Sequence, residues 1–171
     1  LPDTEYVNPT VDRGWQHALT LPRQLTLKNN KVMQFPIQEV LDLAYNGRSI
    51  ELDAQVPFQL DSPCFHATLY PKETFSLQLR EDATLSYDGS VLTFVLGNSG
   101  YGRDARHIEI ENIHCIDVFS DTSSLEIFVN DGEFALTSRI YDTMKTNSIV
   151  SDSNMRLVVR KMKGYHIEKG E

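Results

Sequence analysis

The chain has 171 residues, 40% of them hydrophobic, which is enough for one domain with a substantial core. Its 24 acidic and 16 basic side chains give a net charge of −8, and an acidic surface repels phosphate backbones, so we expect no nucleic-acid partner. No apolar run approaches the length of a membrane span, and the first residues lack the charged-then-apolar pattern of a signal peptide. We therefore expect no membrane partner either.

The N-terminal part predicts a hairpin followed by a short helix. After a polar, proline-bearing start, two apolar segments flank Asn29-Asn30, which suits a two-residue hairpin loop. Pro36 fits a first helical turn, and Asn46-Gly47 supplies a helix stop. Between them, four apolar residues follow the helical period and would form one face: Ile37, Val40, Leu41 and Ala44.

Strand-like segments follow one another from residue 49 onward, with no further helical period of useful length. They cover residues 49–56, 64–71, 74–81, 83–89, 90–97, 105–111, 113–120, 125–141 and 155–162. Short strands in regular succession with turn residues between them favour an all-β sandwich or barrel. Residues 142–154 are polar, and we expect a mobile loop there.

Two Asp-Gly pairs predict tight hairpins in this β-rich part. Asp88-Gly89 would place Leu85 opposite Leu92, and Ala83 opposite Phe94. Asp131-Gly132 would form a type I′ turn, because both of its positions need a positive φ. Pairing across this second loop gives four opposed pairs: Val129 with Phe134, Ile127 with Leu136, Glu126 with Thr137, and Phe128 with Ala135. The last pair is apolar and lies on the other face from the first two, so this hairpin should be covered on both sides.

Three segments in this order resemble glycoside hydrolase family 32, the family of invertases, β-fructofuranosidases and sucrose-6-phosphate hydrolases. They are GWQHALTLPRQLTLKNNKVMQFPIQEV at 14–40, YGRDARHIEIE at 101–111 and SSLEIFVNDGEFALTSRI at 123–140. The resemblance implies a two-sheet antiparallel β-sandwich. Residues 1–34 would be the end of the last propeller blade and a linker, 35–47 a linker helix, and 48–171 the C-terminal β-sandwich.

The motifs that carry this family's hydrolysis are missing from the chain. The family uses a retaining mechanism with two carboxylates, supplied by WMNDPNG and EC motifs, and an RDP motif stabilises the transition state. Here the only tryptophan, Trp15, lies in RGWQH, and Arg103-Asp104 is followed by Ala105. Cys64 follows proline and Cys115 follows His114. We therefore predict no catalytic residue and no cofactor in this chain.

Other candidate sites are weaker. The five histidines are scattered and match no zinc motif, so we predict no metal site, although His107 and His114 could meet in neighbouring strands. Arg103 and Arg106 flank a glycine-bearing loop and could bind phosphate, or could simply pair with nearby carboxylates. The two cysteines, Cys64 and Cys115, are expected to be buried and reduced, which suits the cytoplasm, although a disulfide is open.

Three functions remain open at this point. The first is a non-catalytic sandwich that stabilises the five-bladed catalytic propeller of the same parent chain, a β-fructofuranosidase acting on sucrose or its 6-phosphate. The second is a carbohydrate-binding module that recognises fructans through exposed aromatic side chains, for which the candidates are Tyr87, Tyr101, Phe128, Tyr141 and Tyr165. For Phe128 we favour packing against the linker helix or a neighbouring domain. The third is a small enzyme with two convergent, desolvated carboxylates in a cleft.

The first function also predicts how the N-terminal segment behaves. Separated from propeller strands, residues 1–34 should fold onto their own sandwich or exchange with a second copy in a homodimer, because unpaired strand edges seek partners. The sandwich face that meets the propeller should carry a large apolar patch.

Overall fold

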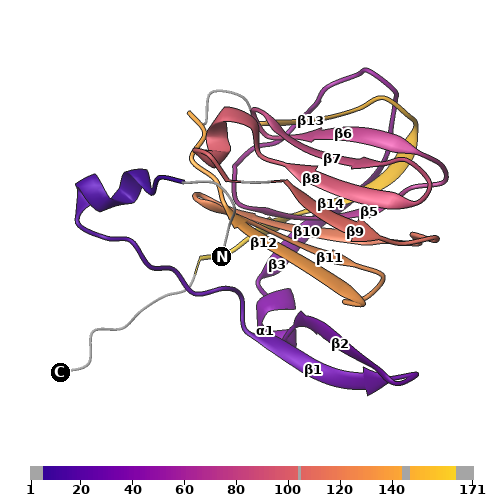
Figure 1. Ribbon diagram of the computed structural model, residues 1–171. Coiled ribbons are helices and arrows are strands. Elements are labelled where there is room, and N and C mark those ends of the chain that lie inside the picture. Colours follow the sequence, from indigo (N-terminus) through magenta and orange to yellow (C-terminus); the bar gives the residue numbers. More distant parts are fainter. Residues whose placement is uncertain (1–5, 104, 144–146, 165–171) are drawn as a thin grey trace.

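The computed structural model describes residues 6–103, 105–143 and 147–164 and shows two antiparallel sheets packed face to face (Figure 1). The first sheet has the order β12-β11-β10-β5-β14-β3, with bounds β3 Ala44–Leu52, β5 Phe65–Tyr70, β10 Ile116–Asp121, β11 Ser124–Val129, β12 Phe134–Arg139 and β14 Met155–Met162. The second has the order β4-β13-β6-β7-β8-β9, with bounds β4 Phe58–Gln59, β6 Phe75–Leu79, β7 Ala83–Tyr87, β8 Val91–Val95, β9 Arg106–Glu109 and β13 Ser148–Ser151. The predicted all-β, two-sheet antiparallel sandwich is therefore confirmed.

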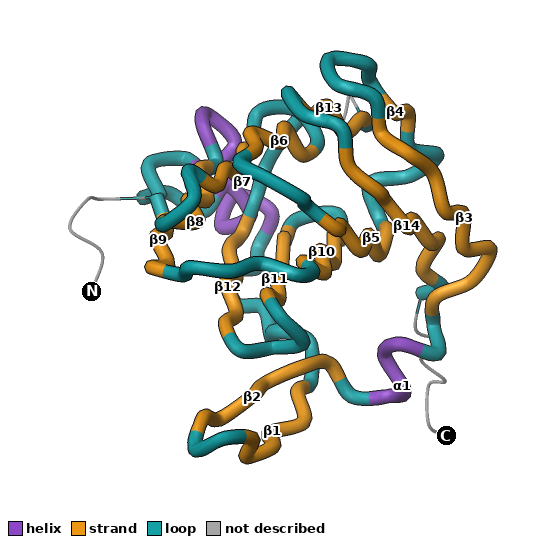
Figure 2. Tube along the Cα trace, turned by 90° about the vertical axis from the view of Figure 1, so that its right-hand side faces the viewer, coloured by secondary structure: helices purple, strands orange, loops and turns teal. Residues whose placement is uncertain are grey.

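An N-terminal arm precedes the sandwich and comprises residues 6–43. It contains the 3-10 helix η1 (Pro9–Arg13), the two-stranded hairpin β1 (Arg23–Lys28) and β2 (Lys31–Pro36), and the helix α1 (Gln38–Leu41). Figure 2 shows this hairpin and α1 together at one end of the molecule, beside the first sheet. A second 3-10 helix, η2 (Gly97–Gly100), belongs to the sandwich.

The main core fills the space between the sheets, as alternation along the strands requires. In β6, Phe75, Leu77 and Leu79 are buried while the residues between them are exposed. In β11 every residue from Leu125 to Val129 is buried, because the first sheet is covered on its outer face as well. Leu125, Ile127 and Val129 belong to the inter-sheet core, whereas Phe128 belongs to a separate apolar cluster under the arm.

The hairpin turns follow their sequence signals in two cases. Asn29 and Asn30 have φ of 52° and 60°, and Lys28 pairs with Lys31 across them. Asp131 and Gly132 have φ of 58° and 91°, and all four predicted pairs of the hairpin are present. Both turns are therefore confirmed, with the positive φ at two central residues that a type I′ turn requires.

The register predicted for the Asp88-Gly89 hairpin is wrong by two residues. Leu85 pairs with Phe94 rather than with Leu92. The Asp88 carboxylate accepts hydrogen bonds from the backbone N of Ser90 (2.8 Å) and of Val91 (2.7 Å), and the Asp88 N donates to the Val91 carbonyl. These bonds move the two-residue loop on to Gly89-Ser90, and Gly89 takes the positive φ of 102°.

The predicted helix of residues 35–47 is much shorter in the structure. α1 ends at Leu41, and Asn46-Gly47 lies inside β3 instead of stopping a helix. β14 pairs with β3 through a register shift, so that Asn46 and Gly47 face Arg160 as a β-bulge, with Asn46 at φ 49°. A left-handed residue serves a helix end and a bulge equally well, and pairing with β14 decided between them here.

The loop predicted at 142–154 is wrong for residues 148–151, and residues 144–146 lie outside the described part of the chain. Ser148–Ser151 form β13, which pairs with β4 and β6 in the second sheet. The Asp142 side chain is fully buried and accepts two hydrogen bonds of 2.7 Å from the guanidinium of Arg80, which is itself fully buried. Arg80 also donates to the carbonyl oxygens of Asp121 (2.6 Å) and Thr122 (3.3 Å), so this ion pair ties three segments together.

Candidate functional site

The structure places the most distinctive surface where the arm meets the outer face of the first sheet. Glu126 on β11 is buried there, and its Oε2 accepts a hydrogen bond from Arg23 Nη2 at 2.6 Å. Its Oε1 accepts another from the backbone N of Leu21, also at 2.6 Å. Arg23 donates further to Gln34 (2.8 Å) and Thr137 (2.6 Å). A buried carboxylate needs such partners, so Glu126 anchors the arm.

An apolar cluster lies next to this ion pair. The buried ring of Phe128 meets Phe35 of the arm edge-on, at 5.5 Å between centroids, and Phe119 at 5.8 Å. Val40 from α1 completes the buried part of the cluster, and the Arg23 guanidinium lies 5.0 Å from the Phe128 centroid. The predicted packing of Phe128 against the helix is confirmed, and no surface of this ring is left for a sugar.

A backbone contact joins the two hairpins. The Gln34 N donates to the Gly132 carbonyl at 2.9 Å. A Cβ at Gly132 would collide with the backbone of Gln34, and φ at this glycine is 91°. Glycine is therefore required at this position both for the turn and for the approach of the arm. The arm thus folds onto its own sandwich, as expected.

The β1–β2 hairpin extends beyond this contact and presents apolar side chains to solvent. Leu25, Leu27 and Val32 are 68%, 74% and 61% exposed, and Leu27 pairs with Val32 across the hairpin. Leu19 and Trp15, earlier in the arm, are exposed as well. Eight of the twelve exposed large apolar side chains among the described residues lie in the arm. The apolar patch that we expected on the sandwich face is therefore mainly on the arm.

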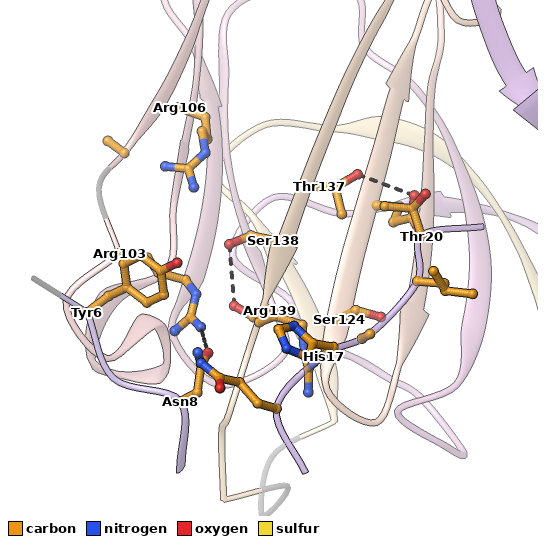
Figure 3. Close-up of a pocket in the computed structure, with 15 residues that line it drawn as sticks. Tyr6, Asn8, His17, Thr20, Arg103, Arg106, Ser124, Thr137, Ser138 and Arg139 are labelled. Atoms are coloured by element: carbon orange, nitrogen blue, oxygen red, sulfur yellow. Dashed lines mark hydrogen bonds between the residues drawn. The ribbon is translucent and has the colours of Figure 1, made fainter. Parts of the chain in front are cut away.

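A polar cleft of about 730 Å³ lies between the arm and the sandwich, with Arg103, Arg106 and Arg139 on its wall (Figure 3). Arg103 donates to the carbonyl oxygens of Gly100 (2.7 Å) and Val7 (3.1 Å) and to the Asn8 side chain. These three partners of Arg103, within the part of the chain that the structure describes, are neutral oxygens. Burial lowers the pKa of Arg103, while the neighbouring Tyr141 and Tyr6 act in the opposite direction.

His107 and His114, which could have met in neighbouring strands, do not meet in the structure. His107 lies on β9 in the second sheet and contacts Thr93 (3.1 Å), whereas His114 precedes β10 of the first sheet and faces Asp131 (3.3 Å). His66 is buried against Asp117, with 2.7 Å between His66 Nε2 and Asp117 Oδ1. The prediction for His166 lies outside the described residues.

Both cysteines are free thiols, so the disulfide left open from the sequence is absent. Cys115 is buried as expected, and Cys64 only partly so. Burial, with the charges of Asp131 and Asp117, raises the pKa of Cys115 to about 11. Burial and the Asp121 carboxylate also raise the pKa of Cys64. Because a nucleophilic cysteine needs a lowered pKa, neither thiol is prepared for covalent catalysis.

Three carboxyl groups have a lowered pKa, which is the opposite of what general acid catalysis requires. A hydrogen bond from Lys161 lowers the pKa of Asp61, one from the Val91 backbone lowers that of Asp88, and one from Lys31 lowers that of Glu133. A glycosidase acid needs a raised pKa instead. These three described groups therefore give no support to a small autonomous enzyme.

The fold and the arm define a β-sandwich domain that carries an exposed apolar extension. The family described as "Glycosyl hydrolases family 32 C terminal" matches residues 23–163. The chain belongs to this family and corresponds to its C-terminal domain.

Individual relatives agree with this assignment. The chain is 32% identical to the sucrose-6-phosphate hydrolase of Bacillus subtilis over 144 residues, which cover 78% of this chain and 30% of that protein. The corresponding enzyme of Salmonella typhimurium is 30% identical over 152 residues, covering 80% and 29%. The chain thus spans less than a third of the length of these relatives.

Solved structures show the same fold. The sucrose-6-phosphate hydrolase from Lactobacillus gasseri superposes with a TM-score of 0.79 at 22% identity, over 95% of this chain and 37% of that one. The family 32 β-fructofuranosidase of Bombyx mori gives a TM-score of 0.67 at 20% identity, over 84% of this chain and 32% of that one.

The helices that the structure describes are all too short to qualify as apolar membrane spans.

Proposed function

We propose that this chain is the non-catalytic C-terminal β-sandwich of a β-fructofuranosidase that hydrolyses sucrose or sucrose 6-phosphate. Its contribution is to stabilise a five-bladed N-terminal catalytic propeller. On this proposal residues 1–34 complete the last blade and its linker, 35–47 connect the domains, and 48–171 form the sandwich. The names of its relatives and the share of their length that it spans support this assignment.

The observation that carries the proposal is the apolar side of the β1–β2 hairpin. Leu25, Leu27 and Val32 are mostly exposed here, although the same hairpin is hydrogen-bonded to the sandwich through Arg23 and Gln34. Burying a leucine or valine side chain fully contributes about 1.5–3 kcal/mol. A catalytic domain covering this hairpin would therefore gain several kcal/mol from a preformed surface.

A chimera tests the proposal. In the Bacillus subtilis enzyme, the matched C-terminal part is replaced by this chain, and melting temperature and hydrolysis of sucrose 6-phosphate are measured. We expect an active, folded chimera whose melting temperature falls in the double variant Leu25→Asp/Leu27→Asp, because two charges then face the catalytic domain. The matched control is Val56→Asp/Val95→Asp, which changes exposed apolar residues of the sandwich and should leave the melting temperature nearly unchanged.

Two outcomes would contradict the proposal. One is equal destabilisation of the chimera by the arm variant and the sandwich variant, which would remove the special role of the hairpin. The other is hydrolysis of sucrose or sucrose 6-phosphate above background by the isolated 171-residue chain. That result would place catalysis within the sandwich itself.

The alternative of a fructan-binding module has narrower support. Among its aromatic candidates, Phe128 is buried, and the Tyr87 hydroxyl donates to the Glu111 carbonyl at 2.8 Å. Tyr101 is exposed but meets Tyr141 edge-on, and Tyr165 lies outside the described residues. Calorimetric titration with an oligofructose separates the two functions, because heat of binding to the isolated chain is expected only for the alternative.

The proposed parent enzyme is cytoplasmic, in keeping with two free thiols and no disulfide in this part of it. A homodimer, or exchange of the arm between copies, would bury the same hairpin surface. Size measurement of the isolated chain across a concentration series distinguishes these from a monomer with a docked arm.

A further inference from the structure

Three potential metal ligands meet at the end of the β10–β11 pair, outside the surface described above. His114 and Cys115 immediately precede β10, and Asp131 lies in the turn after β11. Their donor atoms all lie within 4.8 Å of one another. His114 Nε2 is 3.3 Å from one Asp131 oxygen, and Cys115 Sγ is 3.7 Å from the other.

These separations match the shape of a zinc site. Zinc binds sulfur at about 2.3 Å and nitrogen or oxygen at about 2.0–2.2 Å, so a tetrahedral arrangement places donor atoms about 3.3–3.7 Å apart. The two separations lie in this range, but each goes to a different oxygen of the Asp131 carboxylate. A rotation of the exposed Asp131 side chain would bring one oxygen toward both partners. The third separation joins the donor atoms of His114 and Cys115 and is at most 4.8 Å. The His114 side chain is exposed and has room to shorten it.

The backbone that carries the ligands is held by one buried residue. Asn130 Oδ1 accepts a hydrogen bond from the His114 N at 2.9 Å, and the Asn130 N donates to the Cys115 carbonyl at 3.0 Å. Its Nδ2 donates to the Asn112 carbonyl at 2.8 Å. Such outer contacts orient metal ligands, and here they fix the two chain segments side by side.

We propose that His114, Cys115 and Asp131 bind a divalent transition-metal ion of the zinc class. Thiolate and imidazole ligands select zinc-like ions over Mg²⁺ and Ca²⁺, which prefer oxygen alone. Three protein ligands leave a fourth position for water or another exchangeable ligand. The group lies on the wall of a cleft of about 430 Å³, through which an ion can enter.

Binding would strengthen the contact between arm and sandwich. Asp131 is followed by Gly132, whose carbonyl accepts the hydrogen bond from Gln34 of the arm. A metal ion would link this turn to the start of β10. The turn that accepts the hydrogen bond from Gln34 would then separate from β10 less often. The predicted role is therefore structural and independent of any hydrolytic activity.

Cobalt provides the direct test. The full chain is freed of metal with a chelator and titrated with Co²⁺, and absorption is followed for thiolate-to-cobalt charge transfer and for the bands of tetrahedral cobalt. We expect one Co²⁺ per chain, displaced by one Zn²⁺. Loss of an outer contact typically weakens metal binding about tenfold to hundredfold. Loss of a ligand should weaken Co²⁺ binding more than this in each of three variants, His114→Ala, Asp131→Asn and Cys115→Ser.

Matched controls use the residues of the same types elsewhere in the chain. Cys64→Ser and His107→Ala should bind Co²⁺ like the unchanged chain, and Zn²⁺ should raise the melting temperature of both. Since His114 and Asp131 are exposed, their variants should remain folded, which circular dichroism verifies. Absence of the charge-transfer band in the unchanged chain, or full binding by the His114 and Asp131 variants, would overturn the proposal.

Discussion

In the sandwich, Leu77 and Leu79 of β6 are fully buried between two sheets, whereas Leu25 and Leu27 of β1 alternate in the same way and face solvent. Both strands have the pattern of a half-buried sheet. Each sheet of the sandwich covers the apolar face of the other. The arm hairpin is covered only at one end, where Phe35 packs against Phe128 of the first sheet. The comparison teaches that alternation along a strand buries an apolar face only where a second layer covers it, and among the described residues Leu25 and Leu27 have no such layer.

The largest expected effect concerns the buried ion pair of the sandwich. Arg80→Ala leaves Asp142 buried without its charged partner and should lower the free energy of unfolding by about 3–5 kcal/mol. Urea denaturation followed by circular dichroism measures this. The double variant Arg80→Met/Asp142→Leu removes both charges and should recover much of the loss. A double variant as unstable as Arg80→Ala would show that the pair is not the cause.

The second prediction concerns the apolar cluster under the arm. Phe128→Ala should cost about 3–5 kcal/mol, because it leaves a cavity between Phe35 and Phe119. Trp15, the only tryptophan, lies in the arm against Arg139 and reports arm docking by fluorescence. We expect its emission to change in Phe128→Ala but not in Leu85→Ala, a core control between the sheets. Equal changes would mean that arm and sandwich unfold as one unit.

The third prediction compares two ion pairs of the arm. Arg23→Ala removes the partner of the buried Glu126 and should cost about 1.5–3 kcal/mol. Lys31→Ala removes the partner of Glu133 at a more exposed position and should cost at most about 1 kcal/mol. Denaturation in low and high salt checks the difference, since the exposed pair is screened more strongly. Similar costs for the two variants would contradict the anchoring role of Glu126.

The fourth prediction separates backbone conformation from contact. Gly132→Ala should cost more than about 1 kcal/mol and loosen the arm, because its Cβ would collide with Gln34 in addition to the strain at positive φ. Gly14→Ala is the matched control, since that glycine also has a positive φ but no neighbour within 4 Å. Limited proteolysis of the arm should accelerate only in Gly132→Ala.

The smallest expected effect is a pH dependence confined to the sandwich. Hydrogen bonds from the Val91 and Ser90 backbones hold the pKa of Asp88 below its ordinary value of 3.8. A depressed folded pKa contributes stability above the ordinary pKa, and this is lost as the pH falls through the lower, folded value. Asp88→Asn should therefore flatten the acid side of the stability profile, with Glu51→Gln as the control. An unchanged profile would contradict this.

Much of the fold could be predicted from local residue patterns. The Asn29-Asn30 and Asp131-Gly132 turns, and the cover on both faces of the 125–141 hairpin, follow from positive-φ preferences and from alternation. The Asn46-Gly47 bulge and the shifted Asp88 hairpin could not be predicted with equal certainty. In both, one local signal fits two structures, and a distant strand or a side-chain hydrogen bond selects between them.

In the candidate sites, too, some residues could be recognised from the sequence, whereas their partners could be identified only from the structure. An acidic residue, Glu126, between apolar neighbours was a readable signal that a charged partner would reach it, but nothing local identified Arg23, which is 103 positions away. His114 and Cys115 were visible as neighbours in sequence. Asp131 joins them only because the antiparallel register of β10 and β11 places the turn beside them.

The sequence by itself determined the family, the sandwich class and the expected lack of the family's catalytic motifs, because strand period, turn residues and motif letters are local properties. Only the tertiary structure decided that Arg80 and Asp142 pair in the core, and that the apolar surface lies on the arm. These features depend on residues far apart in the chain meeting at a few ångströms. Burial and pairing at such distances follow from the complete packing of the sheets.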